Sequence, residues 1–244
     1  MDSPFINTER SDSHLIIRLN RPEKLNALTQ EMILALSDIF LGLNSEPNLR
    51  AVILTGTGDE AFCAGTDTTE LAGPNDSKLS ERNRDLFSQI ESCHVPVIAA
   101  VNGIAAGGGC ELALACHLRI ASANARFSLP EARSGIVRGH EGTLEMLTGK
   151  EVSAKEALRF GLINRVVPAA ELLARAEDLA REIAQLAPLA IRACLEAVTK
   201  GNQLSLAEGL ALEAKLFASL FDTDDVREGT SAFLEKRSPV FKGT

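Results

Sequence analysis

The sequence predicts an α/β fold followed by a helical carboxyl-terminal region. Before Glu131, short apolar stretches alternate with segments of helical periodicity, and one apolar stretch leads through a glycine triplet into a helix. After Glu131, strand-like runs disappear and helix signals dominate. Alternating strands and helices predict a parallel sheet with right-handed crossovers. We therefore expect a core of residues 1–168 and a helical region of residues 169–244.

Four apolar stretches are bounded by Gly, Pro, Asn or charged residues and are predicted as strands. They span residues 14–19, 51–55, 95–101 and 118–121. Between the first two, apolar residues recur at helical spacing from Leu28 to Leu43, which predicts an amphipathic crossover helix and a parallel strand pair. A second helix is expected over residues 79–92.

Helix signals continue through the last part of the chain. Ser153 and Glu156 fit a capping box, and Gly161 predicts the end of that helix. Ser205 and Glu208 open another helix in the same way. Helical stretches over residues 171–186 and 206–221 complete this region. Apolar residues surround the last stretch, so we expect it to pack on another subunit; they are Leu206, Leu210, Leu212, Leu216, Phe217 and Leu220.

Composition and charge exclude several classes of protein. The formal net charge of −8 and the isoelectric point near 5.1 argue against a nucleic-acid partner, which requires a basic face. The five cysteines show no CxxC pair and no companion histidines at zinc-site spacing. No apolar run reaches the roughly 20 residues of a membrane span, and the polar amino terminus does not resemble a signal peptide. We expect a reduced, cytoplasmic protein without a metal site or membrane partner.

The glycine triplet Gly107, Gly108 and Gly109 lies between an apolar strand and the helical sequence ELALAC. Glycines at such a turn allow close approach of a ligand, and the first amides of the helix have no intrahelical acceptor. These amides can stabilise a carbonyl oxygen that becomes anionic during a reaction. Glu111 follows within the first helical turn, where it is either a base beside this oxyanion site or a charge that complements the helix amino terminus.

A second segment, residues 61–67 with sequence AFCAGTD, follows the strand at 51–55. It supplies either another backbone amide to the same site or an ordinary turn. Together with four further segments it resembles the crotonase (enoyl-CoA hydratase) family, from Leu15 to the carboxyl terminus. These segments are VNGIAAGGGCELALAC, ISANARFSLPEARSGI, LTGKEVSAKEALRFGLINRVVP and LFDTDDVREGTSAFLEKRSPVF.

The resemblance implies a crotonase-like spiral of ββα or βαβ units with a carboxyl-terminal helical region that forms homotrimers or homohexamers. It places the oxyanion amides on Thr66 and Gly108. It also implies that Glu111 helps to activate water for attack at the β-carbon, and that Glu131 delivers the proton to the α-carbon. Gly139 corresponds to a backbone group near that water.

The implied reaction is hydration of a trans-2-enoyl-CoA to a 3-hydroxyacyl-CoA. Negative charge builds on the thioester oxygen, which the two amides stabilise, while the two carboxyl groups exchange protons with water and substrate. No cofactor is required, because coenzyme A is part of the substrate. Two alternatives stay open: a double-bond isomerase, which needs only Glu131, and a catalytically lapsed CoA-binding assembly protein.

The resemblance also implies a CoA-binding surface. It combines the loop that contains Lys24, Leu25 and Ala27, the backbone around Ala64 and Asp67, and the carboxyl-terminal residues Phe233 and Lys236. Lys24 and Lys236 are candidate phosphate partners or solvated surface lysines. Phe233 packs either on the adenine or on the core.

The chain departs from the family pattern in three places. Family members commonly have Ala at Thr66 and Lys at Thr69, although a backbone amide survives either change. They usually carry Pro at Arg138 and Gly at Glu141. Directly after Thr143, family members have on the order of a dozen further residues, about three helical turns, that this sequence lacks. This difference means either that the active site is remodelled or that the printed sequence omits residues. We interpret His140 and Glu141 as loop residues rather than as acid or base groups.

Overall fold

The computed structural model describes residues 3–43, 45–67, 69, 85–131 and 148–244, and its strands form two sheets. The larger sheet has six strands in the order β1-β2-β3-β5-β7-β10. All its neighbouring strands are parallel except β1 and β2, which form an antiparallel pair. Its strands are β1 (Ile6–Arg10), β2 (His14–Leu19), β3 (Ala51–Gly56), β5 (Val97–Val101), β7 (Leu118–Ser122) and β10 (Arg165–Val167).

A smaller sheet of four strands runs in the order β4-β6-β8-β9. Its strands are β4 (Ala61–Cys63), β6 (Ile104–Ala106), β8 (Arg126–Ser128) and β9 (Val152–Ser153). The chain passes from β3 to β4, from β5 to β6 and from β7 to β8, so each turn contributes one strand to each sheet. This repeated passage confirms the predicted α/β spiral.

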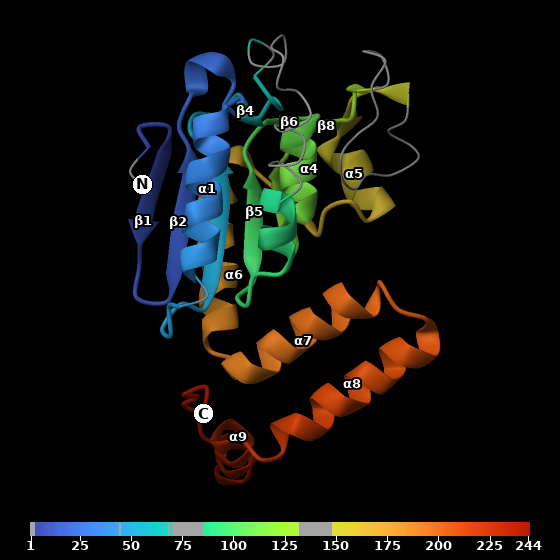
Figure 1. Cartoon of the computed structure of the whole chain (residues 1–244). Coiled ribbons are helices and arrows are strands. Elements are labelled where there is room, and N and C mark those ends of the chain that lie inside the picture. The colour runs from blue at the N-terminus through green and yellow to red at the C-terminus, as the bar shows by residue number, and fades with distance from the viewer. Residues whose placement is uncertain (1–2, 44, 68, 70–84, 132–147) are drawn as a thin grey trace.

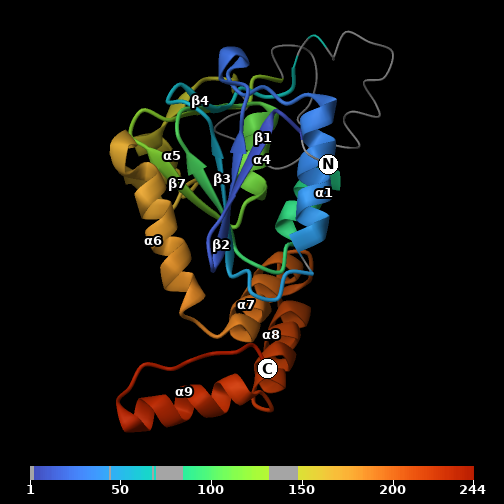
Figure 2. The ribbon, with the colours of Figure 1, turned by 90° about the vertical axis from the view of Figure 1, so that its left-hand side faces the viewer.

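Helices cover both faces of the six-stranded sheet (Figure 2). On one face lies α1 (Gln30–Leu43), whose buried side chains include Met32, Leu36 and Phe40. It connects β2 to β3, which are parallel as predicted. On the other face lies α6 (Leu172–Ala184), which buries Leu172, Ala176 and Ala180 with strand residues of the sheet. Thus the first α-helix after residue 168 packs on the core sheet.

Strands also occur after Glu131, contrary to the sequence-based expectation. In this region β9 pairs with β8 and β10 pairs with β7. Each has only two or three residues, too few to show a pattern, and their partners are distant in sequence. The predicted third strand begins at Val97 rather than Val95. Of the helix predicted at 79–92, the described residues 85–91 are helical.

The predicted caps of the carboxyl-terminal helices are confirmed. Both α5 (Ala154–Phe160) and α8 (Leu206–Leu220) begin with capping boxes, and Gly161 ends α5 in the left-handed conformation. The sequence did not predict α7 (Pro188–Gly201) or α9 (Asp224–Glu235), which follows the helix expected to be last.

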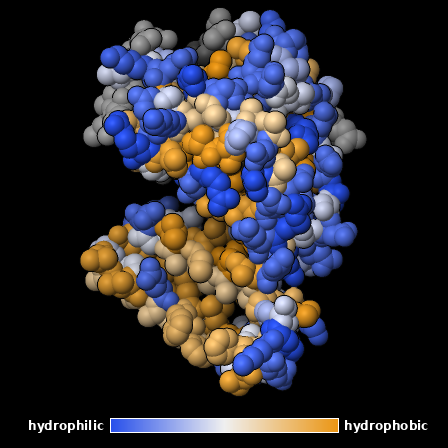
Figure 3. All heavy atoms as spheres, turned by 180° about the vertical axis from the view of Figure 1, so that it is seen from behind, coloured by the Kyte–Doolittle hydropathy of each residue, from blue (hydrophilic) through white to orange (hydrophobic). Residues whose placement is uncertain are grey.

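The helices α7, α8 and α9 extend away from the sheets (Figure 1). Neither α7 nor α8 has a buried residue in the single chain. Leu206, Leu210 and Phe217 of α8 are 80%, 56% and 65% exposed, and an apolar surface covers this part of the molecule (Figure 3). None of the helices in the described ranges has the length and apolar character needed to cross a bilayer.

Candidate active site

The ends of two neighbouring strands of the smaller sheet bring Thr66 next to Gly108. Thr66 follows β4, and Gly108 follows β6 as the first residue of α4 (Gly108–Ala115). A Cβ atom built on Gly108 would lie 3.7 Å from the backbone nitrogen of Thr66 and 3.3 Å from its Oγ1. The structure therefore places the two predicted oxyanion amides beside each other.

The amide of Thr66 faces the site because of a local bridge between Leu28 and Thr66. Leu28 N donates to Gly65 O, and Asp67 N donates to Leu28 O, both at 2.8 Å. In this parallel pairing, the residues before and after Thr66 form the hydrogen bonds to Leu28. The N–H of Thr66 itself therefore points away from Leu28.

Two residues of the glycine triplet, Gly107 and Gly109, are constrained to be glycine. Gly107 has φ 52° and ψ −128°, a conformation for which glycine is suited, and its N–H donates to Ser128 O at 2.9 Å. A Cβ on Gly109 would overlap the carbonyl oxygen of Cys63 in β4. A side chain at Gly109 would therefore prevent α4 from starting this close to the smaller sheet.

The two predicted carboxylates lie on either side of this glycine turn. Glu111 is only 6% exposed, and its Oε2 lies 4.0 Å from the position of a Cβ on Gly108. Oε1 of Glu131 lies 2.8 Å from the position of a Cβ on Gly107, and its Oε2 is buried without a hydrogen-bond partner among the described residues. Two carboxyl groups and two amides therefore meet around Gly107 and Gly108, which is an arrangement for acid–base chemistry beside a developing oxyanion.

Cys110, which precedes Glu111 in α4, is buried and does not ionise readily. Burial raises the pKa of the Cys110 thiol to about 12, and the nearby charges of Glu111 and Glu131 add to this effect. Burial likewise raises the pKa of Cys63 to about 12. Neither thiol is a thiolate near neutral pH, so a cysteine nucleophile has no support here.

Comparisons with known proteins decide the family. The family model described as Enoyl-CoA hydratase/isomerase matches residues 9–244. The chain belongs to the enoyl-CoA hydratase/isomerase family. This confirms the resemblance found in the sequence and the prediction of an enzyme of the enoyl-CoA hydratase type.

Individual relatives match this chain over almost its whole length. A short-chain-enoyl-CoA hydratase of Clostridium acetobutylicum is 36% identical, and the match covers 94% of each chain. A solved enoyl-CoA hydratase from Bacillus anthracis is 38% identical, with a TM-score of 0.94 over 98% of this chain and 100% of that one.

One alignment shows a length difference within the chain. A Bacillus subtilis protein named as an enoyl-CoA hydratase/isomerase is 39% identical over 259 aligned positions that cover both chains completely. The present chain has 244 residues. It therefore lacks residues that this relative contains.

The loop of residues 20–28 lies beside the site of this family member. Ala64 N donates to Leu25 O at 3.0 Å, which adds to the bonds between Leu28 and residues 65 and 67. Lys24 is exposed, and Leu25 has φ 50°. The structure thus brings four predicted CoA-binding residues, Leu25, Ala27, Ala64 and Asp67, into one hydrogen-bonded unit, with Lys24 on its surface.

Sequence reasoning missed two residues that hold this loop. Asn26 is fully buried, and its Nδ2 donates to Thr57 O at 3.0 Å and Ala61 O at 2.8 Å. Arg21 donates to Ala27 O at 2.9 Å and to Asp67 Oδ2 at 3.0 Å. An asparagine before a small residue in a loop is only a weak sequence signal for a residue with a left-handed backbone conformation. No neighbouring residue in the sequence indicated the partner of Arg21.

Two other predicted residues lie far from the site in the single chain. Phe233 is 83% exposed, and both it and Lys236 belong to α9 or its carboxyl-terminal cap. This helix lies at the opposite end of the molecule from β4, β6 and α4 (Figure 1). The chain does not bring Phe233 and Lys236 to Lys24. The predictions for Gly139, His140 and Glu141, and the short segment after Thr143, lie outside the described residues.

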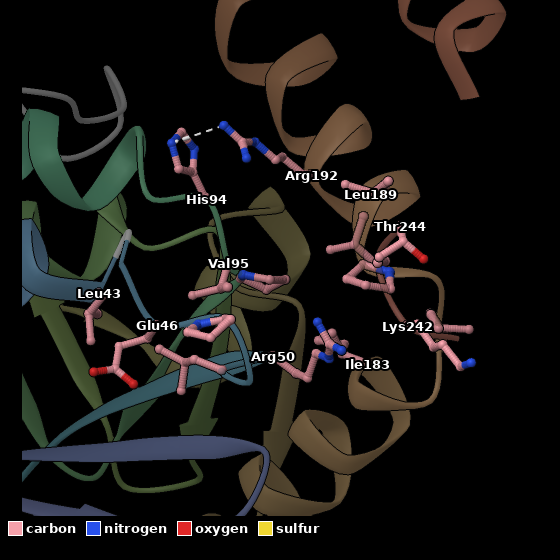
Figure 4. Close-up of a pocket in the computed structure, with 17 residues that line it drawn as sticks. Leu43, Glu46, Arg50, His94, Val95, Ile183, Leu189, Arg192, Lys242 and Thr244 are labelled. Atoms are coloured by element: carbon pink, nitrogen blue, oxygen red, sulfur yellow. Dashed lines mark hydrogen bonds between the residues drawn. The ribbon is translucent and has the colours of Figure 1, made fainter. Parts of the chain in front are cut away.

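A cavity of about 360 Å³ lies between the core and α7, and we call it the α7 groove (Figure 4). Arg50 and Val95 line this groove and lie just before the first residues of β3 and β5. The glycine turn lies beyond the last residue of β5, directly after β6. Arg192 donates to Nε2 of His94 at 3.2 Å, and burial followed by the charge of Arg192 lowers the pKa of His94. The α7 groove is therefore separate from the candidate active site.

Proposed function

We propose that this protein hydrates trans-2-enoyl-CoA thioesters to 3-hydroxyacyl-CoA, with short-chain substrates such as crotonyl-CoA. The observation that carries the proposal is the meeting of two carboxylates and two backbone amides around Gly107 and Gly108. The similarity to the clostridial short-chain-enoyl-CoA hydratase supports the choice of substrate.

In the proposed mechanism, the backbone N–H groups of Thr66 and Gly108 donate hydrogen bonds to the thioester oxygen. Attack of water on the β-carbon moves electrons toward this oxygen, where the amides stabilise the negative charge. Each such donor typically contributes a factor of about 100 to 1,000 in rate, because it is already oriented before the reaction.

The two carboxyl groups carry the protons. Glu111 takes a proton from the attacking water, whose oxygen forms a bond to the β-carbon. Glu131 delivers a proton to the α-carbon as the enolate collapses. Burial of Glu111 and of Oε2 of Glu131 supports the participation of both groups, since water-excluded carboxyl groups interact strongly with a nearby reacting centre.

The proposed reaction uses no resident metal or cofactor, and coenzyme A enters as part of the substrate. We further propose that the protein assembles into homotrimers or homohexamers through the exposed apolar surface of α8. A neighbouring copy then supplies Phe233 and Lys236 to the CoA-binding loop. The separation of α9 from the loop within one chain supports this proposal.

The direct test is the loss of enoyl-thioester absorbance when the purified protein is added to crotonyl-CoA. We expect turnover by the wild type and a decrease in kcat of about 100- to 10,000-fold for Glu111→Gln and for Glu131→Gln. Both variants keep the size of the side chain, and thermal unfolding checks that they are folded.

Other outcomes identify the alternatives. If the wild type converts a 3-enoyl-CoA but does not hydrate crotonyl-CoA, and Glu111→Gln retains that activity, the protein is an isomerase. Binding of acyl-CoA without turnover of either substrate identifies a CoA-binding protein without catalysis. Either result rejects the proposed hydration.

A further inference from the structure

Arg21 and Asp67 form an ion pair between the predicted CoA-binding loop and the strand end that carries Thr66. Both Nη1 and Nη2 of Arg21 lie 3.0 Å from Oδ2 of Asp67, and each side chain is only 12% exposed. The guanidinium also donates to Ala27 O at 2.9 Å and lies 5.4 Å from the ring centre of Phe5. One side chain thus contacts both segments.

The position of the pair relates it directly to the oxyanion site. Asp67 follows Thr66, and Ala27 precedes Leu28, which bonds to the residues on both sides of Thr66. A displacement of residues 27–28 would therefore rotate the peptide group that carries the N–H of Thr66. An oxyanion donor acts only when it is aimed at the oxygen, so such a rotation reduces its contribution.

Both carboxylate oxygens of Asp67 have partners within the chain. Oδ1 of Asp67 accepts hydrogen bonds from Thr69 N at 3.0 Å and Thr69 Oγ1 at 2.7 Å. These bonds, and then Arg21, lower the pKa of the Asp67 carboxyl. Because both oxygens already have partners, the Asp67 side chain is suited to positioning the loop rather than to binding a ligand.

We propose that Arg21 and Asp67 are positioning residues that couple occupancy of the CoA-binding loop to the orientation of the Thr66 amide. This inference rests on the proposed function for the identity of the oxyanion site. CoA bound at residues 20–28 holds the loop in place, and the ion pair transmits that constraint to Thr66. Binding energy from a part of the substrate that does not react is then used at the reacting carbonyl.

Kinetics with two substrates test the coupling. We compare crotonyl-CoA with the crotonyl thioester of N-acetylcysteamine, which lacks the nucleotide handle. In the wild type we expect kcat to be at least about tenfold higher for crotonyl-CoA. In Arg21→Met and Asp67→Asn, this ratio is expected to fall toward one, with kcat for crotonyl-CoA decreased about 10- to 100-fold. A role in folding alone would lower both rates and preserve the ratio.

A spectroscopic measurement tests the same coupling without turnover. The absorption of 4-dimethylaminocinnamoyl-CoA moves to longer wavelength when hydrogen bonds polarise its thioester carbonyl. We expect the wild type to produce this shift and Arg21→Met to lose most of it while still binding the ligand. Arg21→Lys keeps the charge but cannot contact Asp67 and Ala27 in the same way, so an intermediate shift is expected. This variant also serves if Arg21→Met does not fold.

The control is Arg10→Met, which breaks the exposed ion pair between Arg10 and Glu46 at 3.2 Å. It should change neither the substrate ratio nor the absorption shift. Unchanged values in folded Arg21→Met or Arg21→Lys would overturn the coupling. A wild type that shifts the absorption without hydrating crotonyl-CoA would refute the proposed hydration, while the shift would still report on the coupling. A wild type with neither property would refute both.

Discussion

The carboxylate of Glu131 occupies the space that a side chain on Gly107 would need, with Oε1 2.8 Å from the position of the missing Cβ. Gly107 also has φ 52° and ψ −128°, a combination that favours glycine. The residue therefore has two separate reasons to be glycine, one in the backbone and one in the position of a carboxylate that we assign to proton transfer.

The first prediction follows from this relationship. Gly107→Ala should displace Glu131 and decrease kcat for crotonyl-CoA by about 100-fold or more. Backbone strain should also lower the free energy of unfolding by about 1–3 kcal/mol. Gly161→Ala is the matched control, because Gly161 has φ 77° and no atom within 4 Å of the added Cβ. It should lose stability and keep its activity; equal losses of activity in both variants would refute the role of Gly107.

The second prediction concerns the cysteines. The pKa values of Cys63, Cys110 and Cys116 lie near 12 because these thiols are buried, and burial also raises the pKa of Cys93. Of the five cysteines, only Cys194 is exposed. A thiol-alkylating reagent at pH 8 should therefore add one group to the native chain, at Cys194, and five groups after unfolding. Mass spectrometry of peptides identifies the sites, and Cys194→Ser removes the native signal. Rapid native labelling of Cys110 would contradict the burial described here.

The third prediction concerns pH. Hydrogen bonds from Arg237, followed by the backbone N–H of Val240, lower the pKa of Glu228 from 4.5 to about 2. A lowered pKa in the folded state stabilises the protein above pH 4.5, and this stabilisation is lost as the pH falls toward 2.

The thermal midpoint of Glu228→Gln should therefore lie below that of the wild type at pH 7, and the difference should shrink below pH 4.5. Asp12→Asn in the turn between β1 and β2 is the control, since the Asp12 carboxylate is exposed and makes no hydrogen bond or ion pair within the described ranges. A difference that stays constant down to pH 3 would exclude the contribution of Glu228.

The fourth prediction concerns assembly. Phe217 is 65% exposed in the single chain and packs edge-to-face on Phe221 with ring centres 5.0 Å apart. If α8 forms the interface between copies, Phe217→Asp should reduce the molar mass measured by sedimentation or light scattering to that of a monomer or dimer. Leu41→Asp changes a residue of α1 that is 57% exposed, and it should leave the mass unchanged. The same mass for all three proteins would place the interface elsewhere.

Much of the fold could be predicted because its major elements carry local signals. The strand at 14–19, the amphipathic α1 and the two capping boxes depend on residues close together in sequence. The strands of the smaller sheet could not be predicted in this way, since β4, β6 and β8 have three residues each and exist only through pairing with distant segments. The strand β1 was missed for a different reason, because four of its five residues are exposed and it shows no apolar pattern.

In the candidate site, too, contacts between residues close in sequence could be predicted and contacts between distant residues could not. Gly108 and Glu111 lie within one helical turn, so the sequence alone indicated their proximity. Arg21 and Asp67 are 46 positions apart, and their pairing follows from the bridge between Leu28 and Thr66. The sequence offers many possible ion-pair partners for a single arginine or aspartate in a loop, and only the tertiary structure determines which of them is close enough.

The passage of the chain through both sheets in successive turns of the spiral places the two proposed oxyanion amides after neighbouring strands of the smaller sheet. Thr66 and Gly108 follow adjacent hydrogen-bonded strands, so their separation depends on the distance between neighbouring strands, about 4.8 Å in any sheet. That distance is a constant of backbone geometry and does not depend on side-chain identity. If the proposed mechanism holds, replacement of side chains around the turn can change which carbon receives a proton while the two amides keep their spacing.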